Sequence, residues 1–178
     1  MDFVAFDFET ANASRNSAVS LALTVVRNDR IVDEFYSLLN PHTDFHWRNI
    51  KIHGIHASDV TNAPTFNELW PVIAPFFEPD KLVVAHNATF DNSVLKASLL
   101  ANQIQVPSYQ SLDTVRVAKK VFPNLDNHKL NTVAKYLRIP LDHHHNALDD
   151  SVAAANILLN INRQFGPSII QPFIKTLE

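Results

Sequence analysis

The 178-residue sequence has no cysteine, only two glycines and one methionine, and no marked excess of either charge. Without cysteine there is neither a disulfide framework nor a thiolate zinc site. The net charge of −3 argues against the basic surface that proteins use for tight, non-specific binding to duplex nucleic acid. It does not exclude a protein in which bound divalent ions supply positive charge locally.

Targeting signals and long apolar runs are also missing. The first ten residues lack the basic and long apolar regions of a signal peptide, and no run approaches membrane-spanning length. We therefore expect a cytoplasmic protein with no membrane partner. A content of 46% apolar and 19% charged residues suits one folded domain with a real core. We assign that domain to residues 1–165 and leave 166–178 as a C-terminal tail of unknown placement.

Apolar runs and capping signals predict an α/β fold. Strands are expected over residues 3–8, 18–26, 31–38, 82–85 and 111–113. Helices are expected over 65–77, which starts with a capping box and is kinked by Pro71 and Pro75, and over 90–101, 114–121, 129–137 and 147–161. Residues 41–64 are expected to form a loop. The order of the elements predicts a mixed five-stranded sheet flanked by helices.

Asp7 and Glu9 are two residues apart at the end of the first expected strand. Because side chains alternate along a strand, both carboxylates face the same side. Two like charges at the end of a buried strand repel each other and lose hydration, and a hard divalent cation compensates for both effects. The alternative is a pair of carboxylates in water, just beyond the strand.

Another carboxylate, Asp91, follows the strand at 82–85 and opens a helix. A negative charge is favourable at a helix N-terminus whatever its function. Binding sites also form where the strands of α/β sheets end, so Asp91 is a candidate third ligand of the same metal site.

Three consecutive histidines precede the last expected helix. Asn146 is its predicted N-cap, and Asp149 falls in its first turn, where capping is its expected role. The preceding loop can aim His145 independently of the helix. The histidine run fits either a zinc site or a solvated loop, and we expect His143 and His144 to be surface residues.

Three motifs, in this order, resemble those of the DEDDh family of 3′→5′ exonucleases. They are DFET at 7–10, AHNATFD at 85–91 and HNALDD at 145–150, the last of which has the family's H-x-A-x-x-D form. The sequence is most similar to the proofreading (epsilon-like) exonuclease of bacterial DNA polymerase III. Further matches at 52–55, 59–60, 113–114 and 128–130 extend the resemblance from residue 3 to about residue 161. Ala11-Asn12 replaces the Thr-Gly of many relatives, which leaves the acids intact but alters the contact to the terminal nucleotide.

The resemblance implies an RNase H-like fold and a metal-dependent hydrolase that releases nucleoside 5′-monophosphates from a free 3′ end. Asp7, Glu9, Asp91 and Asp150 would hold two Mg²⁺ or Mn²⁺ ions, and His145 would act as the general base. Single-stranded DNA is the expected substrate, and a DNA polymerase is a candidate partner. The alternatives are an exoribonuclease with the same chemistry and a catalytically weak module that binds a polymerase or nucleic acid.

Contacts to the substrate are expected from five further residues: Thr10, Ile52, His53, Asn87 and Phe90. Phe90 has an alternative role in the core, and Asn87 in closing its own turn. The aromatic loop around Trp47 is a possible surface for base stacking. We expect Trp47 to pack onto its own domain instead.

Overall fold

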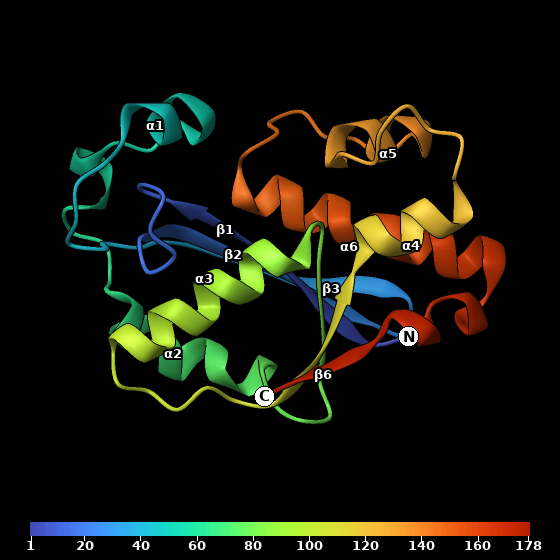
Figure 1. Ribbon diagram of the computed structural model, residues 1–178, viewed down its shortest axis with the longest axis horizontal. Helices are drawn as coiled ribbons and strands as arrows, with labels where there is room; N and C mark the ends of the chain where they lie inside the picture. The colour runs from blue at the N-terminus through green and yellow to red at the C-terminus, as the bar shows by residue number, and fades with distance from the viewer.

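The computed structural model describes residues 1–178 as a mixed sheet with helices on both faces (Figure 1). The strand order is β3-β2-β1-β4-β5-β6. The strands are β1 (Phe3–Thr10), β2 (Ala18–Arg27), β3 (Arg30–Leu38), β4 (Leu82–Ala85), β5 (Tyr109–Asp113) and β6 (Lys175–Leu177). β1 is antiparallel to β2 and parallel to β4, so the predicted mixed α/β architecture is confirmed.

The sheet has six strands, and the prediction of five was wrong because the tail contributes one. β6 pairs antiparallel with β5, with Leu177 opposite Tyr109. Two 3₁₀ turns, Pro167–Ile169 and Gln171–Phe173, lead to it. Between them Ile170 is 1% exposed and belongs to the core. Three residues are too few to display the alternation that identifies a strand in sequence.

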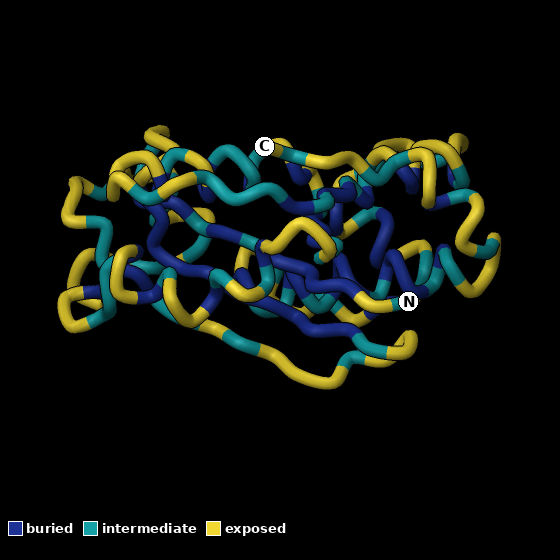
Figure 2. Tube along the Cα trace, turned by 90° about the horizontal axis from the view of Figure 1, so that it is seen from below, coloured by how far each residue is buried: buried dark blue, intermediate teal, exposed yellow.

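Two apolar cores cover the two faces of the sheet. Phe3 and Ala5 of β1 face one core, whereas Val4, Phe6 and Phe8 face the other. The helices of the first core are α4 (Thr114–Val121), α5 (Leu130–Tyr136) and α6 (Ala147–Phe165), and those of the second are α2 (Phe66–Ile73) and α3 (Ala88–Ala101). Figure 2 shows the buried sheet running through the middle of the molecule, with exposed segments on its outside.

The segment 41–64 is not the plain loop that was predicted. It contains helix α1 (Trp47–His53) and a 3₁₀ turn at Ala57–Val60. None of the seven residues of α1 is buried, so the helix lacks the continuous apolar stripe that reveals a helix in sequence. Trp47 is 61% exposed, and the expectation that it packs onto its own domain was wrong.

α6 lies close against the sheet because small side chains face it. Ala153, Ala154 and Ala155 are all buried there. The hydroxyl oxygens of Ser151 on α6 and Thr24 on β2 are hydrogen-bonded at 2.8 Å, which fixes the start of the helix over the sheet. The N-terminus of α6 is thereby held beside the C-terminal end of β1. No helix, α6 included, combines the length and the apolarity needed to cross a lipid bilayer.

Candidate active site

Three carboxylates meet where β1 ends and α6 begins. Asp7 and Glu9 lie on the same face of β1, as its alternation predicted, and are partly buried. Asp150, from the first turn of α6, is 4% exposed. One carboxylate oxygen from each of the three lies within 4.8 Å of the others, a spacing that suits a shared metal ion.

The fourth predicted carboxylate, Asp91, enters from the first turn of α3 and is 2% exposed. Its Oδ1 accepts a hydrogen bond from the backbone N–H of Phe8 at 3.0 Å. The parallel pairing of β1 with β4 ends at Ala5, so the β1 backbone beyond it is open to this contact. Asp91 lies outside the 4.8 Å cluster but lines the same cavity, of about 510 Å³, as the other three acids.

Burial and mutual repulsion raise the pKa of each of these acids. Burial, followed by the charges of Asp91 and Glu9, raises the pKa of Asp7 well above its usual value. Burial also raises the pKa of Glu9 to about 8 and that of Asp91 to about 7, and it raises the pKa of Asp150. Four crowded carboxylates that repel one another match the preference of a hard divalent cation for oxygen ligands.

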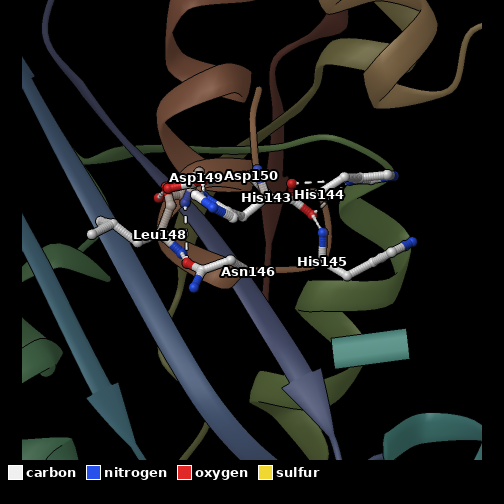
Figure 3. Close-up of polar contacts among 8 residues, drawn as sticks. His143, His144, His145, Asn146, Leu148, Asp149 and Asp150 are labelled. Atoms are coloured by element: carbon white, nitrogen blue, oxygen red, sulfur yellow. Dashed lines mark hydrogen bonds and ion pairs between the residues drawn. The ribbon is translucent and has the colours of Figure 1, made fainter. Parts of the chain in front are cut away.

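The three histidines before α6 point in two directions (Figure 3). His143 is 80% exposed and bonds through Nδ1 to Asp149 at 3.0 Å. The rings of His144 and His145 are stacked 3.9 Å apart. His144 Nδ1 is 3.0 Å from Asp150 Oδ1, so the expectation that His144 is merely a surface residue was wrong.

His145 holds Asp150 through its backbone, because its N–H donates to Asp150 Oδ2 at 3.0 Å. The imidazole ring of His145 takes no part in that hydrogen bond. Burial, followed by the neighbouring His144, lowers the pKa of His145 and favours the neutral imidazole that can accept a proton. The Asn146 side chain accepts from the N–H groups of Leu148 and Asp149, which confirms the predicted N-cap.

Thr10 and His53 meet at the end of β1, and Ile52 lies beside His53 on the exposed face of α1; none of the three lines the acidic cavity. The carbonyl oxygen of Thr10 accepts hydrogen bonds from His53 Nε2 at 3.1 Å and Asn49 Nδ2 at 2.9 Å. Ile52 is 52% exposed. Asn49 was not among the predicted site residues, because nothing in the sequence shows that α1 turns it toward Thr10.

Asn87 and Phe90 do line the acidic cavity. Asn87 has a left-handed backbone with φ 74°, and its N–H donates to Asp113 Oδ1 at 3.0 Å. The guanidinium of Arg15 lies 4.4 Å from the centre of the Phe90 ring. Lys129 and Asn131 also line the cavity and were not predicted as site residues, although residues 128–130 were noted as a match to the family.

His86, a half-buried histidine, also lines the cavity. His86 Nδ1 is 2.8 Å from the Thr114 hydroxyl, and its Nε2 is 2.9 Å from the carbonyl oxygen of His128. Burial lowers the pKa of His86 to about 4, so the ring stays neutral and links β4 to α4 and the start of α5.

Comparisons with known proteins agree with this geometry. The sequence model of the exonuclease family named for RNase T matches residues 4–158. DNA polymerase III PolC-type proteins of Caldanaerobacter subterraneus and Bacillus subtilis are each 32% identical to the chain, over 90% and 95% of its length. The chain spans only 11% and 12% of those two relatives.

Solved structures share the fold. Exonuclease X, in complex with 5′-overhanging duplex DNA, has a TM-score of 0.76 and 22% identity, covering 92% of this chain and 93% of that one. The nuclease domain of 3′hExo, a DEDDh family member bound to rAMP, has a TM-score of 0.80 and 15% identity, covering 99% and 96%. Exonucleases of this kind use divalent metal ions. The family match and the PolC-type relatives together show that the chain belongs to the exonuclease family, as its three motifs predicted.

Proposed function

We propose that the protein is a 3′→5′ exonuclease that removes nucleoside 5′-monophosphates from single-stranded DNA. The observation that carries the proposal is the convergence of four desolvated carboxylates, Asp7, Glu9, Asp91 and Asp150, in one cavity. A fold that needed no cation there would gain stability by replacing such a cluster. Residues 1–165 form the exonuclease domain in this proposal.

The four carboxylates would hold two Mg²⁺ or Mn²⁺ ions, because their donors are all oxygen and their charges are uncompensated. When bound, the ions supply positive charge to the reacting phosphate and lower the pKa of a water molecule. The chain itself orients these ligands. Asp91 is anchored on the Phe8 N–H, and Asp150 on the N–H of His145.

His145 takes a proton from the attacking water in this scheme. The water oxygen forms a bond to phosphorus as the bond from phosphorus to the 3′ oxygen of the preceding nucleotide breaks. That oxygen leaves as the new 3′ hydroxyl after protonation, and the released nucleotide carries the 5′ phosphate. The lowered pKa of His145 keeps the ring neutral before the reaction, as a base requires.

The terminal nucleotide would lie between two groups of residues. Thr10, Ile52 and His53 flank the end of β1, and Asn87 and Phe90 line the adjoining cavity. Base contacts by Ile52 and Phe90 would be largely independent of sequence, because apolar side chains contact the faces of all bases alike.

A DNA polymerase is the proposed partner, since the chain matches a small part of PolC-type polymerases. Co-purification of the tagged protein with a replicative polymerase from its own cells tests this. A clean failure to co-purify at low ionic strength would favour a nuclease that works alone.

The reaction is tested with a 5′-labelled single-stranded DNA incubated with Mg²⁺ or Mn²⁺ and, separately, with EDTA. We expect a metal-dependent ladder that shortens from the 3′ end, and no ladder from Asp7→Asn, which keeps the size of the side chain but removes its charge. An intact oligonucleotide alongside a degraded RNA would replace DNA with RNA as the substrate. Full activity of Asp7→Asn would refute the metal assignment.

A further inference from the structure

Helix α1 presents two different faces. Asn49, Ile50 and His53 are partly buried, and the first and last of these bond to Thr10. The opposite face exposes Trp47, Arg48, Lys51 and Ile52. Trp47 is 61% exposed, an unusual position for the largest apolar side chain.

The groups around Trp47 extend its flat surface. The His46 ring stacks with the Trp47 ring at a centroid distance of 5.8 Å, and the Arg48 guanidinium lies 5.3 Å from the ring centre. We call His46, Trp47, Arg48 and Lys51 the Trp47 platform. An aromatic plane beside cationic groups is the combination by which proteins hold single-stranded nucleic acid, because bases stack on the ring and phosphates meet the charges.

Charge favours a polyanion over a protein as the occupant. α1 carries Arg48 and Lys51 and no acidic residue, in a chain whose net charge is −3. A positive patch on an acidic protein attracts a phosphate backbone locally, whereas a hydrophobic protein partner has no need of the flanking cations.

The platform is also joined directly to the active site. His53, at the end of α1, bonds to the carbonyl of Thr10, which follows the carboxylate of Glu9 in β1. With a rise of ~1.5 Å per residue, Trp47 lies ~9 Å along the helix from His53. That distance is within reach of a single strand whose 3′ end lies in the active site.

We propose that the Trp47 platform binds single-stranded DNA upstream of the bond that is cut. This inference rests on the proposed function for the placement of the 3′ end. With such a platform, the affinity for the substrate depends on strand length, because a short substrate fills the active site without reaching Trp47.

Binding is measured directly by fluorescence in EDTA, without turnover. The chain has two tryptophans, and Trp70→Phe leaves Trp47 as the sole tryptophan, whose emission is excited selectively at wavelengths that tyrosine does not absorb. Trp70 packs against Phe66 and Phe77, so phenylalanine is a tolerated replacement. We expect a long oligothymidylate to quench Trp47, and thymidine 5′-monophosphate to leave its emission unchanged, because a single nucleotide fills the active site without reaching α1.

Measurements of turnover distinguish the role of the platform in substrate binding from the hydrolysis itself. Trp47→Ala should raise KM for a long single strand by about tenfold, the loss of one stacked base, and Trp47→Phe should restore it. The p-nitrophenyl ester of thymidine 5′-monophosphate, which ends at the active site, should be hydrolysed at the wild-type rate by both variants. Val72→Ala is the control, because Val72 is 57% exposed on α2, away from α1.

The cations are tested by salt dependence. Replacing both Arg48 and Lys51 by Gln should reduce the slope of log affinity against log salt by roughly 1.4, because each phosphate contact on a single strand contributes ~0.7. The same change at Lys119 and Lys120, which are exposed on α4, should leave the slope unchanged.

The two proposals fail in different ways. If the wild type hydrolyses neither substrate with metal while Trp47 is still quenched, the exonuclease proposal fails and α1 remains a DNA-binding face. If long DNA is cut with equal KM by wild type and Trp47→Ala, and Trp47 is not quenched, the platform is refuted. Quenching by RNA but not by DNA also overturns it as stated, as does self-association that disappears in Trp47→Ala while DNA affinity is unchanged.

Discussion

The backbone of His145 decides what its side chain is free to do. With φ 71°, the residue adopts a left-handed conformation that histidine accepts at a modest energetic cost. In this conformation its N–H turns to Asp150, and its ring stacks on His144. The peptide group therefore orients a carboxylate while the imidazole remains available to the substrate.

Replacing His145 by alanine should separate metal binding from turnover. The N–H to Asp150 survives the change, so we expect the affinity for Mn²⁺ to stay close to that of the wild type, and turnover to fall by about 10²–10⁴-fold. Calorimetric titration with Mn²⁺ and single-turnover hydrolysis measure the two effects. His143→Ala is the matched control, because His143 bonds to Asp149 and is 80% exposed. A joint loss of metal and activity in His145→Ala would make His145 a ligand.

At this scale the sequence predicts the direction of a side chain only where its backbone is regular. The period of a strand places Asp7 and Glu9 on one face, and the structure agrees. His144 lies in a loop with a neighbour at positive φ, so no periodicity foretells its bond to Asp150. The contact of Asn49 with Thr10 could not be predicted for a related reason, because it depends on how α1 packs against the end of β1.

Among the elements, those with a clear apolar pattern were predicted, including the short strand β4, and those without one were not. The expected strands at 18–26 and 31–38 form the hairpin of β2 and β3, and Asn28 and Asp29 in its turn both have positive φ, as a tight hairpin requires. α6 continues to Phe165, four residues beyond its predicted end. α1 was missed because none of its residues is buried, so it has no apolar stripe, and β6 was missed because three residues are too few to show alternation.

The tail should contribute to stability through Ile170 rather than through β6 alone. Ile170 is 1% exposed in the core beneath α6, so Ile170→Ala should lower the free energy of unfolding by about 2–5 kcal/mol. Urea denaturation measures this, and the hydrolysis rate of the folded enzyme should be unchanged. Val72→Ala, at an exposed position, should shift stability by less than ~0.5 kcal/mol. An unchanged urea midpoint in Ile170→Ala would mean that the tail does not dock in solution.

For the whole molecule, the four acids couple stability to pH, and the proposed metal ions would change that coupling. The folded pKa of Glu9 is about 8 and that of Asp91 about 7, both above the values of an unfolded chain. The folded state therefore holds protons that the unfolded state has released, and stability falls as pH rises through these values. His86, with a pKa of about 4, opposes this trend only in more acidic solution, because above pH ~7 imidazoles are neutral in both states.

Without metal, the free energy of unfolding should thus decrease between pH ~7 and ~8.5, by up to ~1.4 kcal/mol per pH unit for each proton involved. Saturating Mn²⁺ should raise the melting temperature more at the upper end of this range, because at higher pH the acids hold fewer protons that the ion must displace. Scanning calorimetry with EDTA and with Mn²⁺ gives both curves. Asp7→Asn should flatten the pH dependence, and an equally steep curve in that variant would contradict the assignment of the effect to these acids.

The site is also assembled from segments far apart in the chain, with Asp7 and Asp150 at opposite ends of the exonuclease fold. During synthesis on the ribosome, the first two acids emerge long before α6 exists to bring in the last. A half-made chain thus has no complete acidic cluster, and α6 must pack onto β1 and β2 before one forms. A nuclease of this design is harmless to the nucleic acids around it until its own folding is finished.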